Sequence, residues 1–461
     1  MRQSLRSLWN PQHWTLDRTL LILVFVLISG LAGRINAQSD TWWLLRMGQD
    51  IVANSAIPTT EPYSSTVRGS YWPNHEWLSA VMMYGLYQFG GLNVLIVGAV
   101  FVVLITWAGV YRLCEGPPRV RVIAMLLAIV AQATSWSVRP QLLSQAFFVL
   151  ALLLINQPRR HWVYPLLLLG WANIHAGVAT GAIVLLSATG AAIWRFRDQF
   201  WRWWSIGLAS AVATLINPLG WHLWEYTLNS VNSIARKYIQ EWQPPRFNDP
   251  QNYPFFGLVL AVVGIIWFSR RSWTTHRDWT LIICATLLLI LSARSIRHIA
   301  FFALIAAPLL SRQFRAVAPQ PPPLQTIGQI NRWLPIGGLV LSVILVSTAW
   351  SNRSAAFSPT LVAGVRACDG TLFNTFDYGG ELLWFVPERA VFIDNRQDPY
   401  PDELFIAAGQ AEDRGTYQAL FERFDVRCAL VPSGKALDLA LHQAGWVELA
   451  RDATLVVLQK P

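Results

Sequence analysis

The stretch LLILVFVLISGLAGRI, residues 20–35, sets the first constraint on the fold because it is almost entirely apolar. An apolar run of this kind is typical of a membrane-spanning helix. Basic residues precede it, at Arg2, Arg6 and Arg18, and no small-residue cleavage site follows it cleanly. The run therefore predicts a first helix that is retained rather than removed as a signal peptide, with the N-terminus in the cytoplasm.

Similar apolar runs continue to about residue 350, where the composition changes. Of the 461 residues, 54% are hydrophobic and 13% are charged, whereas soluble domains carry about 25% charged residues. Beyond residue 350, charged and turn-forming residues return to ordinary levels. We therefore predict a cytoplasmic N-terminus at residues 1–19, a transmembrane domain at residues 20–350, and an extracytoplasmic domain at residues 351–461.

Arginines gather in the short loops between the apolar runs. Placing every such cluster in the cytoplasm requires about eleven spans and leaves the C-terminal domain outside. The net charge of +10 then reflects these inner loops and not nucleic-acid binding. The clusters are Arg2, Arg6 and Arg18; Arg112, Arg119 and Arg121; Arg159 and Arg160; Arg195, Arg197 and Arg202; Arg270, Arg271 and Arg277; and Arg312, Arg315 and Arg332.

The predicted fold class is therefore an α-helical polytopic membrane protein of about 11 transmembrane helices with a C-terminal extracytoplasmic α/β domain. Its expected location is the cytoplasmic (inner) membrane of a bacterium. Two spans are short: residues 163–172 and 299–310 would form helices of about 15 Å and 18 Å, against a hydrocarbon core of about 30 Å. Short or broken helices bury polar backbone at membrane depth, which is tolerated where that backbone lines a cavity.

With this topology, an unusual set of polar residues falls on the outer side. A large first outer loop, residues 36–91, carries the first members, and later outer turns carry the rest. Carboxylates, imidazoles and guanidinium groups would thus gather around the expected cavity. The set includes Asp40, Glu61, His75, Glu76, Arg139, Asn173, His175, Glu241, Arg294, Arg297 and His298.

Several of these residues also have an ordinary interpretation. Asp40 would serve as a helix cap, and His75 and Glu76 as solvated loop residues. Arg139 would be a loop charge, although arginine on the outer side runs against the topology bias. His175 is harder to explain in this way, because ionisable groups at membrane depth are costly and usually functional.

The same set also suits a definite chemistry. A carboxylate near the membrane surface can act as a general base on an acceptor hydroxyl. Arginine and histidine in a cavity can hold a phosphate through charge-assisted hydrogen bonds. These groups would serve transfer of a group from a lipid-linked phosphate, with cations stabilising the leaving phosphate.

Two other functions fit the spacing of these polar residues. A transporter of an anionic solute would use similar residues, but no matching polar set is found on the inner side. A non-catalytic envelope scaffold would use the outer domain to bind a partner. The sequence has no nucleotide-binding GxxxxGK[ST] or GxGxxG loop in a suitable context, no CxxC and no HExxH. A divalent metal held by Asp40, His75 and Glu76 is chemically feasible, and no cofactor is predicted.

The chain resembles the C-type (GT-C) superfamily of integral membrane glycosyltransferases, which use polyprenyl-phosphate-linked sugars. The likeness rests on many spans, a first outer loop that opens with an acidic residue, and a C-terminal outer domain. The tract Asp40-Thr-Trp-Trp-Leu-Leu-Arg-Met-Gly is similar to that family's loop, and the other motifs resemble a bacterial branch. Asp40 is not followed by a second acidic residue, and the tryptophan-rich acceptor motif of the oligosaccharyltransferases is missing.

The resemblance implies a membrane enzyme that transfers a hexose or pentose from a polyprenyl-phosphate donor to an extracytoplasmic acceptor whose identity the sequence leaves open. Asp40 matches the position of the family's catalytic base. We assign donor phosphate binding to Arg139, His175, Arg297 and His298, and shaping of the site to His75, Glu76, Asn173 and Arg294. The expected partners are the sugar donor and membrane lipid, without nucleic acid.

The C-terminal part has the pattern of a small α/β domain. Residues 390–394 and 428–432 are predicted strands, and residues 446–450 and 454–458 a hairpin. The turn-rich segments 377–381 and 394–400 would be ordinary loops, or would cap the cavity and bind the acceptor. Cys368 and Cys428 would form a disulfide in an oxidising compartment, or remain two buried thiols.

Overall fold

The computed structural model describes residues 16–229, 239–317, 336–344 and 357–461. The chain divides into two compact units, each built from segments that are distant in sequence. The first unit comprises residues 1–36, 96–217 and 239–352, and the second comprises residues 37–95, 218–238 and 353–461. The residues of the predicted outer loop thus fold together with the C-terminal domain. Arg2, Arg6, Arg332 and both ends of the predicted last span, residues 334–350, lie outside the described residues, and residues 336–344 of that span are helical.

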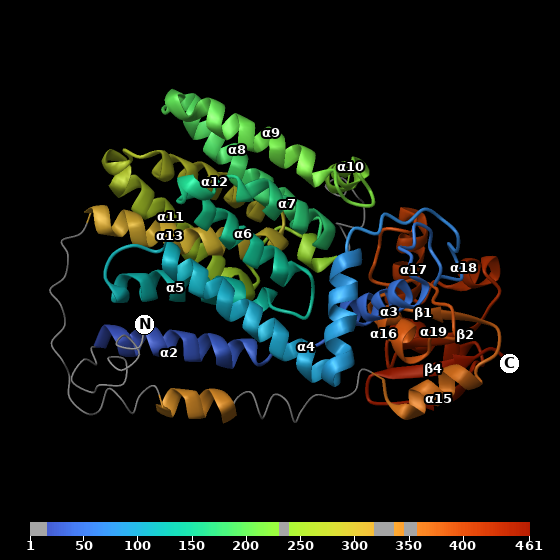
Figure 1. Ribbon diagram of the computed structural model, residues 1–461. Helices are drawn as coiled ribbons and strands as arrows, with labels where there is room; N and C mark the ends of the chain where they lie inside the picture. The colour runs from blue at the N-terminus through green and yellow to red at the C-terminus, as the bar shows by residue number, and fades with distance from the viewer. Residues whose placement is uncertain (1–15, 230–238, 318–335, 345–356) are drawn as a thin grey trace. The chain divides into compact units, whose positions relative to one another are not determined.

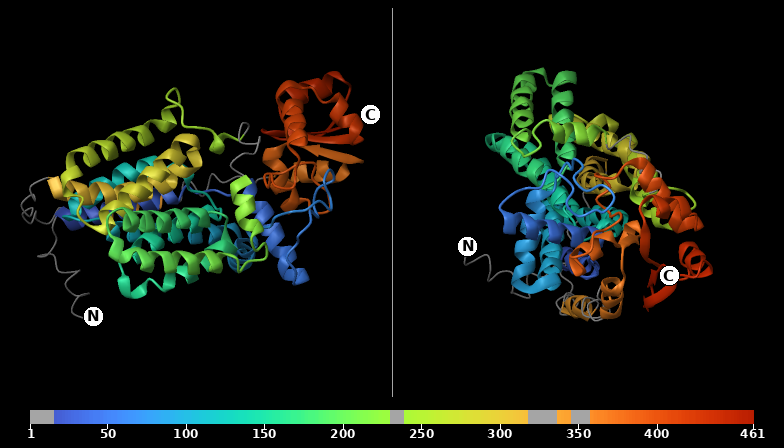
Figure 2. Two further views of the ribbon diagram at one scale, coloured as in Figure 1. Left: turned by 90° about the horizontal axis from the view of Figure 1, so that it is seen from above. Right: turned by 90° about the vertical axis from the view of Figure 1, so that its right-hand side faces the viewer.

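Helices form the first unit, as Figures 1 and 2 show. At its centre lies α13 (Ile299–Val317), and residues 299–310 of this helix are all buried. The helix continues for two turns beyond residue 310, so the predicted short span was wrong in length. Its neighbours and the other helices are α2 (Leu16–Ala32), α5 (Pro118–Gln132), α6 (Gln141–Ile155), α7 (Val163–Ile174), α8 (Val178–Trp194), α9 (Phe200–Thr214), α11 (Tyr253–Ser269) and α12 (His276–Arg294).

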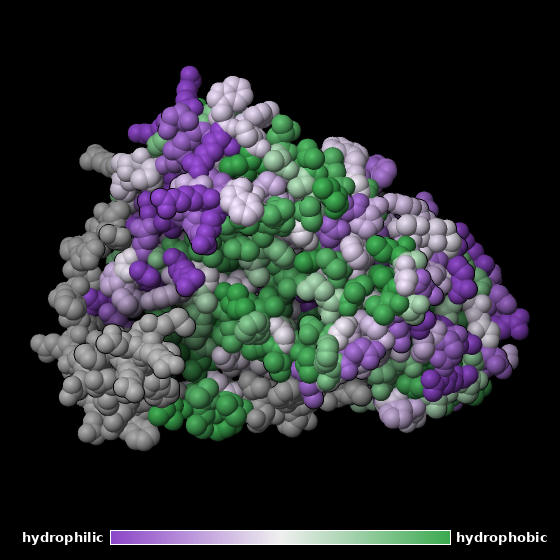
Figure 3. Space-filling view, viewed as in Figure 1, coloured by the Kyte–Doolittle hydropathy of each residue, from purple (hydrophilic) through white to green (hydrophobic). Residues whose placement is uncertain are grey.

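The helices of this unit present apolar side chains outward. Leu260 and Phe268 on α11 are 74% and 76% exposed, and Figure 3 shows apolar residues gathered over the middle of the helices. Among the described residues, four helical stretches are long and apolar enough to cross a membrane: Trp77–Leu113, Pro118–Ser135, Pro250–Ser269 and His276–Arg294. An exposed apolar surface over long apolar helices is that of a polytopic membrane protein.

The predicted helix break in the first unit is present. The twelve-residue helix α7 ends at Ile174, and α8 begins at Val178. His175 between them is in an extended conformation, with φ −167° and ψ 142°. The two helices pack against α9 and α12, respectively.

Helix α4 (Trp77–Leu113) changes direction within its length. The backbone leaves helical geometry at Gly90 and Gly91, and Gly91 has a φ of +63°. This left-handed conformation is costly for residues with a Cβ atom, so glycine is suited to it. The helical part after the bend corresponds to the second span that the apolar runs predict, at about residues 92–111.

The second unit combines helices from the outer loop with a small sheet. Strands β1 (Thr371–Asn374) and β2 (Val426–Pro432) are parallel, and β2 and β3 (Val447–Arg451) each pair antiparallel with β4 (Leu455–Gln459). The order is β1-β2-β4-β3, so the predicted strand at 428–432 and the hairpin are confirmed. The helices are α3 (Ser39–Asn54), the start of α4, α10 (His222–Asn229), α15 (Pro359–Ala367), α16 (Gly379–Phe385), α17 (Asp402–Arg414), α18 (Gln418–Arg423) and α19 (Ala436–Gln443).

The predicted strand at residues 390–394 was wrong. This buried segment forms no ladder with the sheet; instead its backbone bonds to the outer loop. Val391 N donates to Tyr63 O at 3.1 Å, and Ser65 N donates to Val391 O at 2.8 Å. The apolar sequence was read correctly as buried, but its hydrogen-bonding partners come from a loop more than 300 residues earlier.

Candidate functional site

Asp40 lies in the first turn of α3, close to the helix N-terminus. The N-cap of this helix is Gln38, so the alternative interpretation of Asp40 as the helix cap does not hold. Its carboxylate accepts a hydrogen bond from Trp43 Nε1 at 3.2 Å. An acidic group in the first helical turn interacts favourably with the helix dipole.

The helix α16 packs along α3 and brings a second carboxylate to this place. Ser39 Oγ donates to Glu381 Oε2 at 2.6 Å and accepts from Gly380 N at 3.1 Å. A Cβ atom on Gly380 would lie 2.0 Å from Ser39 O, and one on Gly379 would lie 2.4 Å from Ile393 O. The glycine pair is therefore what permits this close approach.

Asp377, Glu381 and Asp40 influence one another electrostatically. Burial, with the nearby charges of Asp40 and Asp377, raises the pKa of Glu381 to about 7. Burial and the charge of Asp40 also raise the pKa of Asp377. Like charges that lie close together disfavour one another's ionisation, so Asp377 and Glu381 hold protons to a higher pH than isolated carboxyl groups do.

His75 and Glu76 lie beside a different carboxylate of the second unit. His75 Nδ1 is 3.8 Å from Asp398 Oδ2, and His75 Nε2 is 3.7 Å from Glu76 Oε1. The imidazole also packs on the ring of Tyr226, whose hydroxyl donates to Asp398 Oδ1 at 2.8 Å. The side chains of His75, Glu76 and Asp398 are each less than 15% exposed. His75 and Glu76 are therefore not solvated loop residues.

The pKa of Asp398 is raised to about 6, chiefly by burial, and the nearby His75 and the Tyr226 hydrogen bond only partly offset this. At 3.8 Å the His75 ring and the Asp398 carboxylate interact electrostatically, and Tyr226 supplies the hydrogen bond to Asp398.

A buried ion network holds the segment that carries Asp398. The Arg396 guanidinium binds Asp394 at 2.5 and 2.9 Å and Glu61 of the outer loop at 3.0 Å, and it stacks over the ring of Trp72 at 4.6 Å. The side chains of Arg396, Asp394 and Glu61 are fully buried. Segment 394–400 is thus not an ordinary loop but a fixed connection between the outer loop and the C-terminal domain.

In the first unit, Arg139 and Arg297 converge on one carboxylate. Arg139 Nη1 and Nη2 lie 3.2 and 3.4 Å from the two oxygens of Glu241, and Arg297 Nη1 lies 3.5 Å from Oε1. Burial alone would raise the pKa of Glu241, but the charges of Arg139 and Arg297 outweigh it and hold the pKa below its usual value. The place is an anion site built from two guanidinium groups.

Short helical turns position this anion site. Glu241 belongs to the 3₁₀ turn η7 (Gln240–Trp242), and Arg297 to η10 (Ile296–His298). Ser295 Oγ donates to Glu241 O at 3.0 Å, and the Arg297 guanidinium lies over the Trp242 ring at 4.7 Å. His298 follows Arg297 in the same turn, and Arg294 ends α12 as an exposed residue.

His175 and Asn173 are bound within the helix bundle. His175 Nδ1 lies 2.9 Å from Ser144 Oγ and accepts from Gly177 N at 2.9 Å. Asn173 Nδ2 donates to Ile216 O and to Leu169 O, at 2.8 and 2.9 Å. Both side chains therefore stabilise the break between α7 and α8, and their assignment to the donor site stays a prediction.

The residues considered for a metal do not form one cluster. Asp40 lies with Asp377 and Glu381, whereas His75 and Glu76 lie with Asp398. Within the described ranges, no three His, Cys, Asp or Glu side chains are arranged to hold a metal ion.

Sequence reasoning placed Glu241 in the outer polar set without a role in the site, and it missed Asp377, Glu381 and Asp398 as members of these clusters. Asp377 and Glu381 are four residues apart, a spacing that places two side chains on one helical face, and two glycines between them indicate a close approach. Nothing in the local sequence pairs Glu241 with Arg139, because the contact spans 102 positions.

Cys368 and Cys428 form a disulfide with a Cα–Cα distance of 5.9 Å. It joins the end of α15, where Cys368 is the C-cap, to β2. The other two cysteines, Cys114 and Cys284, are buried free thiols.

Several solved structures share this architecture. ArnT from Cupriavidus metallidurans bound to undecaprenyl phosphate aligns with 95% of this chain and 96% of its own, at 14% identity and a TM-score of 0.51. The archaeal oligosaccharyltransferase AglB from Archaeoglobus fulgidus, in complex with an inhibitory peptide and a dolichol-phosphate, aligns with 91% of this chain and 70% of its own, at 11% identity and a TM-score of 0.58.

The chain has the fold of the C-type glycosyltransferases. The apo form of the Archaeoglobus fulgidus oligosaccharyltransferase gives a similar alignment, with 92% of this chain and 70% of that one covered, 12% identity and a TM-score of 0.53. No protein-family profile matches the sequence. No curated protein matches it either. The C-type fold predicted from the sequence is thus confirmed, and the bacterial branch stays a prediction.

Proposed function

We propose that this protein is a membrane glycosyltransferase that moves a sugar from a polyprenyl-phosphate-linked donor to an extracytoplasmic acceptor. The observation that carries the proposal is the convergence of Arg139 and Arg297 on the single carboxylate of Glu241. Two guanidinium groups around one anion are the arrangement that phosphate recognition requires. The C-type fold supports the same assignment as an analogy.

Donor binding would use the anion site of the first unit. The Glu241 carboxylate stands in for a phosphate, and the donor phosphate would take its place between Arg139 and Arg297. His298, beside Arg297 in η10, is proposed as a further phosphate ligand, and Arg294 and Asn173 as residues that shape the entrance. His175 keeps its proposed role as a phosphate ligand only if its ring leaves the contact with Ser144.

Acceptor activation would use Asp40 of the second unit. The Asp40 carboxylate takes the proton of the acceptor hydroxyl as the hydroxyl oxygen bonds to the anomeric carbon of the sugar. The bond between that carbon and the phosphate oxygen breaks, and the phosphate leaves with the electron pair. Arg139 and Arg297 stabilise the charge that develops on it.

His75 and Glu76 are proposed to shape the acceptor side through their contacts with Asp398. We place the N-terminus in the cytoplasm and the C-terminal domain outside the inner membrane of a bacterium, because the arginine clusters favour that orientation.

Binding of undecaprenyl phosphate to purified full-length protein tests the donor site. Wild type is expected to bind, and Arg139→Ala/Arg297→Ala is expected to lose at least about 100-fold in affinity, because hydrogen bonds to charged groups contribute about 1.5–3 kcal/mol each. Glu241→Gln is expected to gain about tenfold, because the phosphate no longer displaces a carboxylate.

Arg160→Ala is the matched control, since Arg160 is an exposed arginine of a different loop, and it should bind as wild type does. An absence of binding by folded wild type would contradict the proposal and favour the transporter or the scaffold. Solute flux in vesicles would then separate these two.

A further inference from the structure

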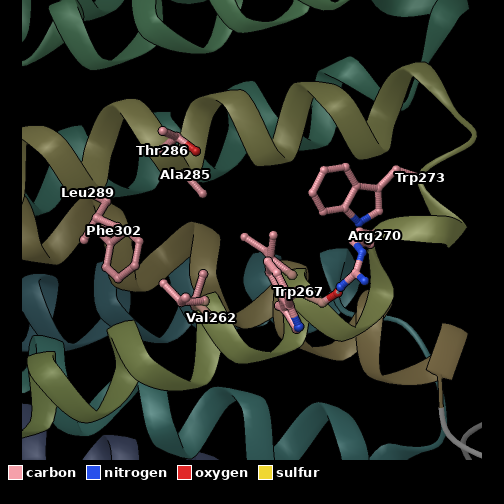
Figure 4. A pocket seen from close by; sticks show the side chains of 10 residues that line it. Val262, Trp267, Arg270, Trp273, Ala285, Thr286, Leu289 and Phe302 are labelled. Atoms are coloured by element: carbon pink, nitrogen blue, oxygen red, sulfur yellow. The ribbon is translucent and has the colours of Figure 1, made fainter.

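Helices α11 and α12 enclose an apolar slot in the first unit. Both helices pack against α13, and the slot between them has a volume of about 290 Å³. Val262 and Ala285 line its sides, and Phe302 of α13 is a fully buried part of its floor. Figure 4 shows these side chains directed into the space between the two helices.

The rim of the slot faces the surroundings with apolar side chains. Val263 and Trp267 on the α11 side are 52% and 63% exposed. Both helices are among those long and apolar enough to cross a membrane. An apolar slot with an apolar rim on such helices opens toward lipid rather than toward water.

One end of the slot is cationic and aromatic. Arg270, Trp267 and Trp273 lie together there, as Figure 4 shows. The Arg270 guanidinium lies over the Trp267 ring at 4.4 Å and donates to Trp267 O at 2.9 Å. Tryptophan and arginine at the end of an apolar helix mark the level of lipid headgroups.

The ion pairing of Arg270 differs from that of two other arginines in the first unit, Arg277 and Arg312. Arg277 lies 2.7 Å from Glu115, and Arg312 lies 2.5 Å from Asp278. Within the described part of the chain, Arg270 forms no ion pair with a carboxylate, and it is exposed. Its charge is therefore offered to an external anion at the end of an apolar slot.

We propose that this slot binds one acyl chain of an anionic phospholipid whose phosphate lies on Arg270. The slot supplies the apolar surface for the chain, the tryptophans border the glycerol level, and Arg270 supplies the charge that selects an anionic headgroup. The site is independent of the donor site around Glu241.

The test uses full-length protein in mild detergent, incubated with phosphatidylglycerol and phosphatidylethanolamine of equal chain length. Native mass spectrometry counts the retained lipid. Wild type is expected to retain one molecule of phosphatidylglycerol in preference to phosphatidylethanolamine. Arg270→Ala should lower that preference about fivefold, because a basic residue near a membrane surface attracts anionic lipid by this factor. Thr286→Trp, which fills the slot from an exposed position, should remove the retained lipid of both kinds.

Two matched controls should behave as wild type: Arg160→Ala on another loop and Val212→Trp on the exposed face of α9.

Retention of equal amounts of both lipids by wild type would overturn the proposal. So would loss of undecaprenyl phosphate rather than phosphatidylglycerol in Thr286→Trp, which would assign the slot to the donor. A dimer that Thr286→Trp dissociates would also overturn it, because a second copy would then occupy the slot. The Arg270→Ala variant keeps the test decisive if Thr286→Trp does not fold.

Discussion

Ser39 Oγ donates a hydrogen bond of 2.6 Å to Glu381 Oε2 across 342 positions of sequence. This contact joins the start of the first outer loop to the C-terminal domain. Asp40 is the next residue after Ser39, so the position of the proposed base depends on a helix near the other end of the chain. The C-terminal domain is therefore part of the wall around Asp40 and not an appended cap.

Glu381 should make the stability of the protein depend on pH. Its pKa is raised from an ordinary 4.5 to about 7 in the folded state. The folded state thus binds the proton more tightly, and the resulting stabilisation is present below pH 4.5 and is lost as the pH rises through 7. Over this window the free energy of unfolding should fall by up to about 3 kcal/mol.

The Glu381→Gln variant isolates this contribution, because Asp398 and Glu412 also titrate near neutral pH. Thermal melting at pH 5 and pH 8 should show a smaller pH dependence in the variant than in wild type, with the variant the more stable at pH 8. Glu388→Gln, at an exposed position paired with Arg366, is the control. Equal pH dependence in Glu381→Gln and wild type would contradict the assignment.

Arg396→Met should destabilise the second unit strongly. Removal of one partner from a buried ion network leaves uncompensated carboxylates, here Asp394 and Glu61, and typically costs about 3–5 kcal/mol. The outer loop should also become sensitive to protease between α3 and α4, since Arg396 holds Glu61. Limited proteolysis and the melting temperature measure both effects.

The exposed pair Arg427 and Asp425 provides the comparison, with a distance of 3.2 Å and side chains more than 60% exposed. Arg427→Met should change stability by less than about 1 kcal/mol. Similar losses in both variants would show that burial of the Arg396 network contributes nothing.

The disulfide between Cys368 and Cys428 should be detectable by counting thiols. Of the four cysteines, two are free, so denatured protein should react with two equivalents of a thiol reagent before reduction and four after it. The bridge spans 60 positions, a loop for which closure entropy predicts about 4 kcal/mol of stabilisation. Four reactive thiols without reductant would disprove the pairing.

Local patterns in the sequence were sufficient to predict much of the fold. Hydropathy located the apolar helices, and the short run near residue 170 located the break at His175. Two short apolar runs separated by a polar turn located the β3–β4 hairpin. The segment 390–394 was assigned wrongly because its backbone partners are loop residues, and no local pattern reports such a contact.

Prediction of the site was limited by the same long-range contacts. Arg139 and Arg297 were selected because charged residues at their positions are unusual for the topology, and Asp40 because it matches the position of the family's catalytic base. Glu241 and Asp398 carry no comparable signal: each is an ordinary loop acid until the fold brings a partner to it. The metal set of Asp40, His75 and Glu76 was plausible in sequence but is divided between two clusters by the packing of α16 and of the segment 394–400.

Release of free polyprenyl phosphate from a sugar-loaded donor tests the central claim most directly, because it does not require the acceptor to be known. Purified protein is incubated with radiolabelled donor and extracted membrane components as a source of acceptor. Wild type and Asp369→Asn, a control at an exposed aspartate, should release the carrier, and Asp40→Asn should release none while melting at the wild-type temperature. Undiminished release by Asp40→Asn would remove Asp40 from the role of base, and no release by wild type would contradict glycosyl transfer itself.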